Sequence, residues 1–521
     1  MEAVAAGGSA AGAAAGAGRR ALVFVGFMGA GKSSAARAVA AELGVRPVDS
    51  DRELEQSLGQ PIETFFDRHG EAEFRRREEE LIVGLLARAD GGVVALGGGA
   101  LGSDRVREAL APHVVVHLEV SSDAAWRRAS GKGRPLARDR ARFDQLFAER
   151  RARYEASADA IVLASDRGVA ARALPSLLAL RDGPPGTRCV WASGGAAEYP
   201  VFLGRGLLAS GFFPPLGGRR FAVSDENVAP LHRVEADWSW EIPPGESEKT
   251  LGRAEAVLRG MASAGVARDD LVGAVGGGVV GDLAGFCAAV YQRGIRHVQA
   301  PTTLVAQVDS AYGGKTGVDL PEGKNYAGAY HQPSAVMVDP AALDTLPAAE
   351  RAAGYAEVVK TALIAGGELW SRVRGGSEPD AAIVLGCLRS KLAVVAEDER
   401  DEGRRQVLNL GHTIGHAIEA ATGYERFRHG EAVAIGLLCA LRLSGREQLR
   451  SVVAELFRAR GLPLSCPGVD ADAVVELVAR DKKRRGGSVP FVLVESPGQV
   501  TPGHELAEDA VRAAVEEVCA E

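Results

Sequence analysis

Hydrophobic and polar positions follow two different patterns along the chain. Up to about residue 339, short apolar runs such as residues 21–25 and 114–120 are rich in Val and Leu, and helical segments follow several of these runs. Buried strands that alternate with helices are typical of α/β domains with parallel sheets. From Pro340 onward glycine becomes rarer and helical periodicity dominates. The pattern therefore predicts an α/β protein whose last part is helical.

A Pro- and Gly-rich stretch at residues 181–186 separates two differently patterned regions. The 521 residues are enough for several domains or for two enzymes of ordinary size. Residues 1–18 are mostly Ala and Gly, with no basic segment before an apolar core, so we expect a disordered tail and no signal peptide. The expected parts are the tail at 1–18, an α/β domain at 19–174, a linker at 175–196, a second α/β domain at 197–339 and a helical domain at 340–521.

Composition narrows the class of protein. Lys and Arg number 61 against 68 Asp and Glu, and 61 − 68 = −7 does not favour a nucleic-acid partner. The six cysteines are scattered without a Cys-x-x-Cys motif, which argues against a disulfide scaffold or a cysteine zinc site. No apolar run reaches the length of a membrane span. We therefore expect a cytoplasmic protein with no nucleic-acid or membrane partner.

The first apolar strand runs into a glycine-rich turn at residues 26–33, which reads Gly-x-x-x-x-Gly-Lys-Ser and precedes an Ala-rich helical segment. Strand, turn and helix in this order are the context that identifies a phosphate-binding P-loop. Lys32 would reach the β- and γ-phosphates of ATP, and Ser33 would contact Mg²⁺. The expected nucleotide-binding residues are Gly29, Ala30, Gly31, Lys32, Ser33 and Ser34.

Other polar groups of the first domain also lie at predicted strand ends. Asp49 and Asp51 can divide the work of holding metal-bound water and accepting a hydroxyl proton, although helix capping is the alternative. The charged helix predicted around residues 70–80 is also typical of an ordinary solvated face. Three glycines at 97–99 permit close approach of a ligand to the backbone. The basic segment around Arg134 is interpreted as a lid that closes on phosphates.

Together these motifs closely resemble the shikimate kinase family over about residues 21–180. The P-loop, Asp-x-Asp, Phe-Arg, Gly-Gly-Gly, Arg-Pro-Leu and Glu-Arg-x-x-x-Tyr elements all appear in order. The resemblance implies a P-loop kinase domain with a parallel sheet and flanking helices, which phosphorylates shikimate with ATP and Mg²⁺. Asp49 would support Mg²⁺ together with Ser33, and Glu78 would orient Arg75. The implied catalytic residues are Lys32, Asp51 and Arg134, and the implied shikimate contacts are Asp51, Arg75, Gly97, Gly98, Gly99 and Arg150.

Glycine turns of the second α/β region carry charged residues. A predicted strand ends in Gly276, Gly277 and Gly278 and leads into a helix, which is either a phosphate-contacting turn of the Rossmann kind or a tight turn without a ligand. Lys315 and Lys324 stand in or beside further glycine turns. Positive charge combined with close backbone approach favours an anionic ligand there.

The helical region contains a histidine-rich stretch. His412 and His416 would share one face of a helix, and His429 follows shortly after. Gly411 and Gly415 within this helical pattern would each cost about 1 kcal/mol relative to Ala, so we expect a close backbone approach there. Imidazole suits a divalent transition metal, and Glu357 is a natural further ligand. A buried polar pair on an ordinary helix is the alternative to a metal site.

Residues 197–521 resemble the 3-dehydroquinate synthase family along their whole length. The motifs that carry the resemblance are Gly-Glu-x-x-Lys, Gly-Gly-Gly-Val-Val-Gly-Asp, Pro-Thr-Thr, Gly-Gly-Lys, Gly-Lys-Asn, Ala-Glu-Val-Val-Lys, Asn-x-Gly-His-x-x-Gly-His and His-Gly-Glu-Ala-Val. They imply a Rossmann-like NAD domain, an all-helical metal-binding domain, NAD, and one divalent metal, Zn²⁺ or Co²⁺. The implied reaction turns 3-deoxy-arabino-heptulosonate 7-phosphate into 3-dehydroquinate and phosphate.

The resemblance also implies roles for particular residues. The metal ligands would be Glu357, His412 and His429, and the catalytic side chains Lys315, Lys360 and His416. The expected NAD site consists of Asp225, Glu246, Lys249, Gly277, Gly278, Val279, Asp282, Thr302, Thr303, Lys315 and Lys324. The expected substrate contacts are Arg293, Asp309, Asn325, Arg405, Asn409 and Lys483. Arg293 matches a residue that acts across a dimer interface, so a homodimer is implied.

Two alternatives remain open. The second half resembles other sugar-phosphate cyclases of the same fold, such as 2-deoxy-scyllo-inosose or cyclitol synthases. One half could instead be an inactive regulatory module, although Lys32, Asp51, Glu357, His412 and His429 are all present.

Overall fold

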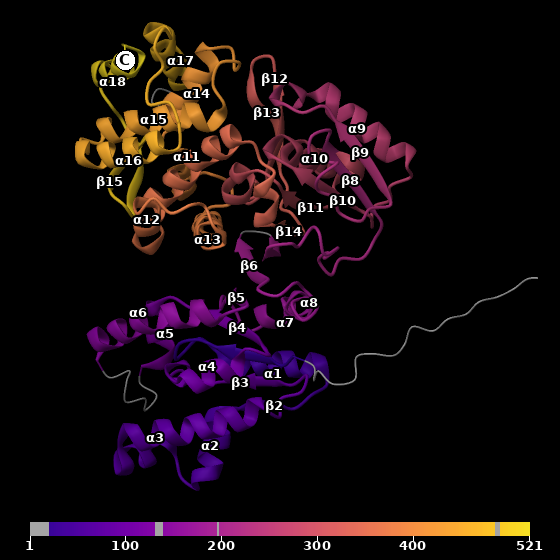
Figure 1. Ribbon diagram of the computed structural model, residues 1–521, viewed down its shortest axis with the longest axis vertical. Coiled ribbons are helices and arrows are strands. Elements are labelled where there is room, and N and C mark those ends of the chain that lie inside the picture. Colours follow the sequence, from indigo (N-terminus) through magenta and orange to yellow (C-terminus); the bar gives the residue numbers. More distant parts are fainter. Residues whose placement is uncertain (1–19, 131–138, 195–196, 485–489, 521) are drawn as a thin grey trace, which may run out of the picture. The chain divides into compact units, whose positions relative to one another are not determined.

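The structure is a computed structural model that describes residues 20–130, 139–194, 197–484 and 490–520 (Figure 1). It divides into one unit that ends at Asp182 and another that begins at Gly183. The predicted roles of Arg134 and of the Lys483 side chain fall outside the described residues, as does the predicted tail. None of the helices in the described ranges combines the length and hydropathy needed to cross a lipid bilayer.

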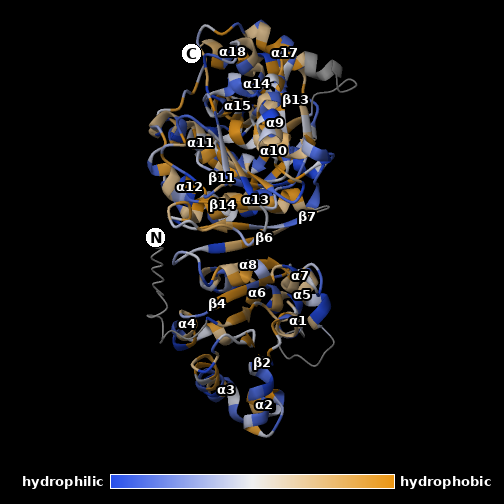
Figure 2. Cartoon of the chain, turned by 90° about the vertical axis from the view of Figure 1, so that its right-hand side faces the viewer, coloured by the Kyte–Doolittle hydropathy of each residue, from blue (hydrophilic) through white to orange (hydrophobic). Residues whose placement is uncertain are grey.

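The first unit is built on a parallel sheet whose strands follow the order β2-β3-β1-β4-β5. Its strands are short and apolar (Figure 2), and the residues of β4 are almost entirely buried. The strands are β1 (Leu22–Val25), β2 (Pro47–Asp49), β3 (Val93–Ala95), β4 (Val114–Glu119) and β5 (Ala160–Leu163). The helices are α1 (Lys32–Leu43), α2 (Ser50–Leu58), α3 (Ile62–Leu86), α4 (Asp104–Leu110), α5 (Ser122–Ala129), α6 (Arg140–Ser157), α7 (Val169–Arg172) and α8 (Leu174–Ala179).

The second unit begins with a sheet in the order β6-β7-β14-β11-β10-β8-β9. All neighbours are parallel except β6 and β7. The strands are β6 (Arg188–Gly194), β7 (Ala197–Leu203), β8 (Arg220–Asp225), β9 (Trp238–Ile242), β10 (Leu271–Gly276), β11 (Arg296–Pro301) and β14 (Ala335–Val338). Helices α9 (Leu251–Ser263) and α10 (Gly278–Val290) pack on it, and β12 (Lys315–Leu320) and β13 (Gly323–Tyr330) form a separate antiparallel hairpin.

The last part of the chain is helical, as predicted. The helices are α11 (Ala348–Ala365), α12 (Gly367–Arg374), α13 (Ala381–Glu397), α14 (His412–Ala421), α15 (His429–Leu443), α16 (Glu447–Ala459), α17 (Ala471–Arg484) and α18 (Glu508–Ala520). They gather at one end of this unit in Figure 1, with α9 and α10 at the other. The part predicted as all-helical also contains an antiparallel hairpin, β15 (Phe491–Ser496) with β16 (Gln499–His504), because two alternating apolar runs flank the turn at Pro497 and Gly498.

One hydrophobic core connects the second sheet to the helices. Val201 of β7 and Val336 of β14 are fully buried in the same cluster as Val359 of α11 and Val433 of α15. This packing fixes α11 and α15 against the sheet, and it determines which of their faces meet. The predicted linker at 175–196 spans part of α8 and the whole of β6, while the division between the units falls at 182–183.

Candidate active sites

The P-loop of the first unit connects β1 to α1. Gly29 and Gly31 have φ of 83° and 93°, in the left-handed region that glycine adopts without strain. A Cβ atom at Gly29 would lie 2.7 Å from the carbonyl oxygen of Ala125, so the loop also packs too closely for a side chain there. Lys32 Nζ donates to the carbonyl oxygens of Gly26 (2.9 Å) and Phe27 (3.2 Å). The lysine ammonium is therefore held over the loop, next to the N-terminus of α1.

The three glycines after β3 bring backbone against charged side chains. A Cβ at Gly97 would lie 2.5 Å from Oδ1 of Asp51, and one at Gly99 would collide with the guanidinium of Arg75. A side chain at either position would displace charged groups from α2 or α3, which occupy this space. The structure therefore brings together the Asp-x-Asp, Phe-Arg and Gly-Gly-Gly motifs, which lie far apart in the sequence.

Two arginines frame this glycine turn. Arg75 forms an ion pair with Glu78 at 2.5 Å, and Arg150 of α6 donates to the carbonyl oxygen of Gly98 at 2.9 Å. Tyr154 donates to the same oxygen at 2.5 Å. Burial raises the pKa of Glu78 even though Arg75 opposes the shift. A small pocket opens here between the glycines, Arg150 and Tyr154, and its rim is positively charged.

Asp49 ends β2, and its Oδ1 accepts the backbone N–H of Asp51 at 3.2 Å. This is the capping contact that was the alternative to a magnesium role. Asp51 begins the first turn of α2, with its carboxylate facing Gly97. The two aspartates therefore make different contacts: Asp49 caps α2, and Asp51 lines the glycine turn.

In the second unit, the predicted NAD residues lie at one edge of the sheet. Asp225, Gly276 and Pro301 end the neighbouring parallel strands β8, β10 and β11, and Thr302 and Thr303 follow directly. Ligands of open α/β sheets bind beyond the carboxyl ends of such strands. A Cβ at Gly277 would lie 2.9 Å from Thr303 Cγ2.

Lys249 is the centre of an ion-pair network beside this edge. It is only 4% exposed, and its Nζ lies 3.0 Å from Asp282 and 3.6 Å from Glu246. Burial would lower the pKa of Lys249, but Asp282 and Glu246 outweigh burial and raise it. Three of the predicted NAD residues therefore form one charged cluster at the start of α10.

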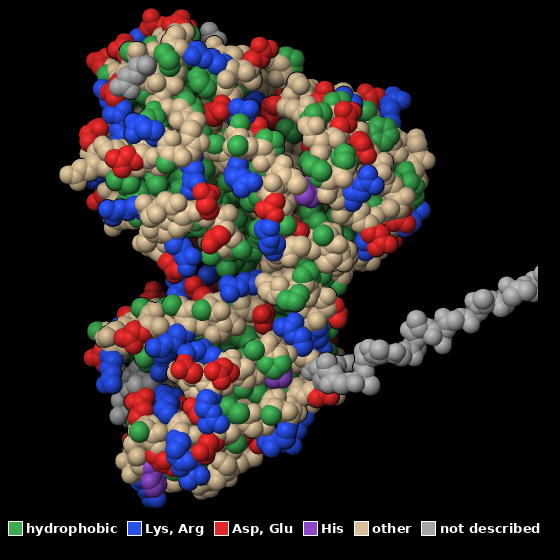
Figure 3. Space-filling model, viewed as in Figure 1, with side chains coloured by type: hydrophobic (Ala, Val, Ile, Leu, Met, Phe, Trp, Pro, Cys, Tyr) green, Lys and Arg blue, Asp and Glu red, His purple; other side chains and the backbone are tan. Residues whose placement is uncertain are grey.

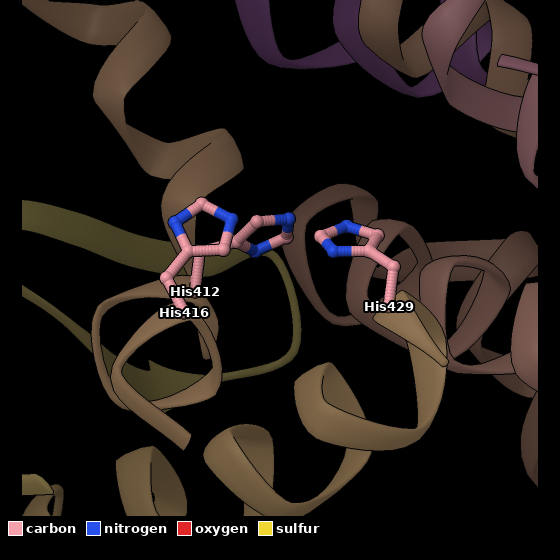
Figure 4. Close-up of side chains that lie close together, drawn as sticks. All are labelled: His412, His416 and His429. Carbon is pink, nitrogen blue, oxygen red and sulfur yellow. The ribbon is translucent and has the colours of Figure 1, made fainter. Parts of the chain in front are cut away.

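Three histidines meet where α11, α14 and α15 pack together (Figure 4). His412 and His416 project from α14 toward His429 at the start of α15, with ring centroids 5.2 to 5.7 Å apart. Glu357 of α11 is almost fully buried beneath them. Its Oε1 atom lies 3.5 Å from Nε2 of both His412 and His429.

This arrangement fits a divalent metal. Ligand atoms on a tetrahedron with zinc bonds of about 2.0–2.2 Å lie about 3.3–3.5 Å from one another. The separations between Glu357 Oε1 and the two Nε2 atoms, 3.5 Å each, match this spacing. The nitrogen atoms of His412, His416 and His429 also lie within 4.8 Å of one another. Glu357 Oε1 therefore joins His412 and His429 at the spacing of metal ligands, and His416 lies beside them.

Gly411 was predicted inside the histidine helix, and this prediction is wrong. Gly411 precedes α14 with φ of 79°, a left-handed conformation that starts the helix at His412. Gly415 is inside the helix, and a Cβ there would lie 3.1 Å from the carbonyl oxygen of Ala432 in α15. The expected close backbone approach is thus the contact between α14 and α15, which brings His429 to the other two histidines.

The lysines around this cluster are held by carboxylates. Lys360, also buried, lies 2.5 Å from Glu357 Oε2 and 2.7 Å from Asp309 Oδ2. Lys315 lies 2.5 Å from Asp401. Residues Arg404–Asn409 form a 3₁₀ turn, which carries both Arg405 and Asn409. Arg405 is buried and donates to the carbonyl oxygens of Glu399 (2.5 Å) and Gly313 (2.9 Å).

Sequence reasoning missed three charged residues of this site. Lys391 of α13 forms an ion pair with Asp309, Asp401 pairs with Lys315, and Glu419 pairs with His429 and Lys324. The first two carry no sequence signal, because their partners lie more than 80 residues away. Glu419 does carry a sequence signal, since it follows His412 by seven residues and therefore shares its helix face.

Comparisons with known proteins agree with the geometry of both units. The family model described as shikimate kinase matches residues 28–177. Models for the N-terminal and C-terminal parts of 3-dehydroquinate synthase match residues 239–353 and 354–484. The 3-dehydroquinate synthase of Halorhodospira halophila is 43% identical over 347 residues, covering 62% of this chain and 98% of that protein. That of Methylococcus capsulatus is 44% identical over 337 residues, covering 59% and 92%.

Solved structures extend the comparison to cofactors. A 2-epi-5-epi-valiolone synthase from Streptomyces hygroscopicus, with NAD⁺ and Zn²⁺ bound, is 28% identical with a TM-score of 0.57, covering 63% of this chain and 98% of that one. A 2-deoxy-scyllo-inosose synthase complexed with carbaglucose-6-phosphate, NAD⁺ and Co²⁺ is 25% identical with a TM-score of 0.56, covering 64% and 100%. The chain therefore belongs to the 3-dehydroquinate synthase family and carries a shikimate kinase domain before the synthase, which makes it a bifunctional enzyme of the shikimate pathway.

Proposed function

We propose that the first unit transfers the γ-phosphoryl group of ATP to a hydroxyl of shikimate. The observation that supports this most directly is the P-loop, whose lysine is held over a helix N-terminus. Lys32 and the backbone N–H groups of the loop neutralise the phosphates, and Ser33 and Asp49 hold Mg²⁺. Catalysis then consists mainly of positioning and charge neutralisation, with Arg134 closing over the transferred group.

Shikimate is an anion, and the glycine turn offers it a positively charged pocket. Arg75 and Arg150 bind its carboxylate, since a guanidinium presents paired donors to a carboxylate. Glu78 keeps Arg75 in place through their 2.5 Å ion pair. Asp51 lies against Gly97 and accepts the proton of the reacting hydroxyl.

Gly99→Ala tests the acceptor pocket. The new Cβ would collide with the Arg75 guanidinium and displace it, so we expect kcat/KM for shikimate to fall about 10- to 100-fold. The KM for ATP should not change, because the P-loop is untouched. Gly84→Ala is the matched control, since its Cβ comes no closer than 3.9 Å to the described atoms around it. Equal losses for both substrates would contradict the assignment of Arg75 to shikimate.

For the second unit, we propose conversion of 3-deoxy-arabino-heptulosonate 7-phosphate to 3-dehydroquinate and phosphate. The supporting observation is Glu357 Oε1, equidistant from the Nε2 atoms of His412 and His429. When bound, the metal supplies Lewis acidity and NAD supplies reversible hydride acceptance. Glu357, His412 and His429 hold the metal, and NAD lies along the edge formed by Asp225, Gly278 and Thr302.

The remaining charged side chains hold substrate and move protons. Lys315, Lys360, Asn325, Arg405, Asn409 and Lys483 bind its anionic groups. Asp309, which pairs with Lys360 and Lys391, accepts from a substrate hydroxyl instead. His416 is solvent-accessible next to the metal ligands. Desolvation by the surrounding protein, followed by the neighbouring His412 and His429, lowers the pKa of His416. We assign this ring to a proton relay, because a group that holds a proton weakly also passes it on readily.

The alternative of another sugar-phosphate cyclase has weaker support. The solved cyclases of that kind are 25–28% identical to this chain, whereas the Halorhodospira synthase reaches 43%. The test is to assay both proposed reactions on one purified chain. Phosphate release from a cyclitol-type substrate, with none from the heptulosonate, would overturn the synthase assignment. Failure of only one reaction would leave that half as an inactive module.

We further propose that the chain is a cytoplasmic homodimer joined through the synthase. Arg293 is exposed. Gln292 and Arg293 have φ of 48° and 68°, a left-handed conformation that costs of order 1–3 kcal/mol per residue and persists only where surrounding contacts hold it. A partner surface would provide those contacts. Sedimentation should give twice the chain mass, and Arg293→Ala should lower synthase turnover; a fully active monomer would refute the dimer.

The proposed domain limits are 19–174 for the kinase, 197–339 for the NAD-binding domain and 340–521 for the helical domain.

A further inference from the structure

Glu419 is a buried carboxylate with two opposite partners. It lies near the end of α14 with 1% of its side chain exposed. Oε2 accepts from Nδ1 of His429 at 3.3 Å, and Oε1 accepts from Nζ of Lys324 at 2.9 Å. Each oxygen of the carboxylate therefore has a partner of its own.

The contact with His429 decides which ring nitrogen is free. A neutral imidazole carries one N–H, and a carboxylate at Nδ1 holds the proton there. The lone pair is then on Nε2, the atom that lies 3.5 Å from Glu357 Oε1. If Glu419 were neutral or absent, the ring could adopt the other tautomer or rotate, and Nε2 would no longer face Glu357 and His412.

We propose that Glu419 is a positioning residue that fixes His429 for metal binding and, through Lys324, connects the metal site to the NAD site. This rests on the proposed metal site. Lys324 belongs to β13 of the hairpin and lies 3.5 Å from Glu246, which lies 3.6 Å from Lys249. A chain of alternating charges therefore runs from His429 to the predicted cofactor residues, with Glu419 as its first link.

Among the described neighbours, other groups support this geometry. Lys324 also lies 4.8 Å from the centroid of the Tyr424 ring, which follows α14. The ammonium is therefore held by a carboxylate, by a ring face and by Glu246 at once. Because Lys324 and Glu419 are 95 residues apart in sequence, the contact secures the hairpin against the histidine helix.

The test measures metal affinity directly, by competition with a chromophoric chelator. Glu419→Gln keeps the size of the side chain but removes its charge, so affinity for Zn²⁺ and Co²⁺ should fall about 10- to 100-fold. The visible absorption of the Co²⁺ form should also change, because the His429 ligand is no longer held in one orientation. Glu425→Gln, at an exposed position just after α14, is the matched control and should behave as the wild type.

Two further variants separate the possible outcomes. Lys324→Gln should weaken NAD binding and should also lower metal affinity, because Glu419 loses one of its two partners. A Lys324→Gln variant with wild-type metal affinity would refute the connection between the two sites. If His429→Ala loses metal but Glu419→Gln does not, the positioning role is refuted while the metal site stands. If His429→Ala also binds metal as the wild type does, the proposed metal site itself is wrong. Should Glu419→Gln not fold, Glu419→Asp keeps the charge but withdraws the carboxylate from His429, and metal affinity is measured in the same way.

Discussion

Lys32→Ala should lower kcat for shikimate phosphorylation by about 10³-fold and leave synthase turnover unchanged. The ammonium is the only side-chain cation that the P-loop of the described structure places over the α1 N-terminus, between the carbonyl oxygens of Gly26 and Phe27. Without it, the negative charge that develops on the phosphoryl oxygens loses one of the positive groups that balance it. Coupled assays of ADP formation and of phosphate release on the same preparation measure both reactions.

Arg46→Ala is the control for this variant. Arg46 is an exposed cation just beyond α1, so its removal changes the charge of the domain but not the P-loop. It should leave both activities within about twofold. If Lys32→Ala also abolished the synthase reaction, the two sites could not be independent, and the assignment of one reaction to each half would have to be abandoned.

Removal of the transition metal should have the opposite pattern. Dialysis against dipicolinate, with millimolar Mg²⁺ present throughout, should reduce synthase turnover by at least about 100-fold and spare the kinase. The proposed ligands Glu357, His412 and His429 would lose the metal. Lys360 would remain paired with Glu357, from which it lies 2.5 Å away. Added Zn²⁺ or Co²⁺ should restore turnover.

His412→Ala makes the metal experiment specific to the proposed ligands. The variant should resemble the stripped wild type and should not recover with added Zn²⁺. A stripped enzyme that retained full synthase activity would show that no metal is required. A His412→Ala variant with normal metal content would instead show that the metal binds elsewhere.

Local motifs were predictable because residues that are neighbours in the sequence determine their backbone geometry. The P-loop needs left-handed glycines and a following helix, and Gly29, Gly31 and Lys32 supply these within four positions. The shared face of His412 and His416 followed from helical spacing in the same way. Both predictions concern contacts made within a single turn of the chain.

Contacts made by tertiary packing were not predictable from spacing. The helical pattern includes Gly411, but its φ of 79° places Gly411 just before the first turn of α14. Glu419 was visible in the histidine stretch, but its partner Lys324 lies on a hairpin 95 residues earlier. Asp401 and Lys391 carry no motif, and their importance comes only from Lys315 and Asp309, which packing brings to them. Surface charge does not single out a site either, since charges of both signs are mixed across the face drawn in Figure 3.

The pairing of β7 with β14 has a consequence for synthesis on the ribosome. Val201 pairs with Val336, so this part of the sheet cannot close until 336 − 201 = 135 further residues have emerged. The first unit makes its longest strand pairing, Leu22 with Val114, well before any of the synthase sheet is complete. The kinase is therefore ready to fold during translation, whereas the synthase stays unfinished and exposes unpaired strand edges for longer. The order of the two enzymes along the chain thus places the slower-closing topology after the faster-closing one.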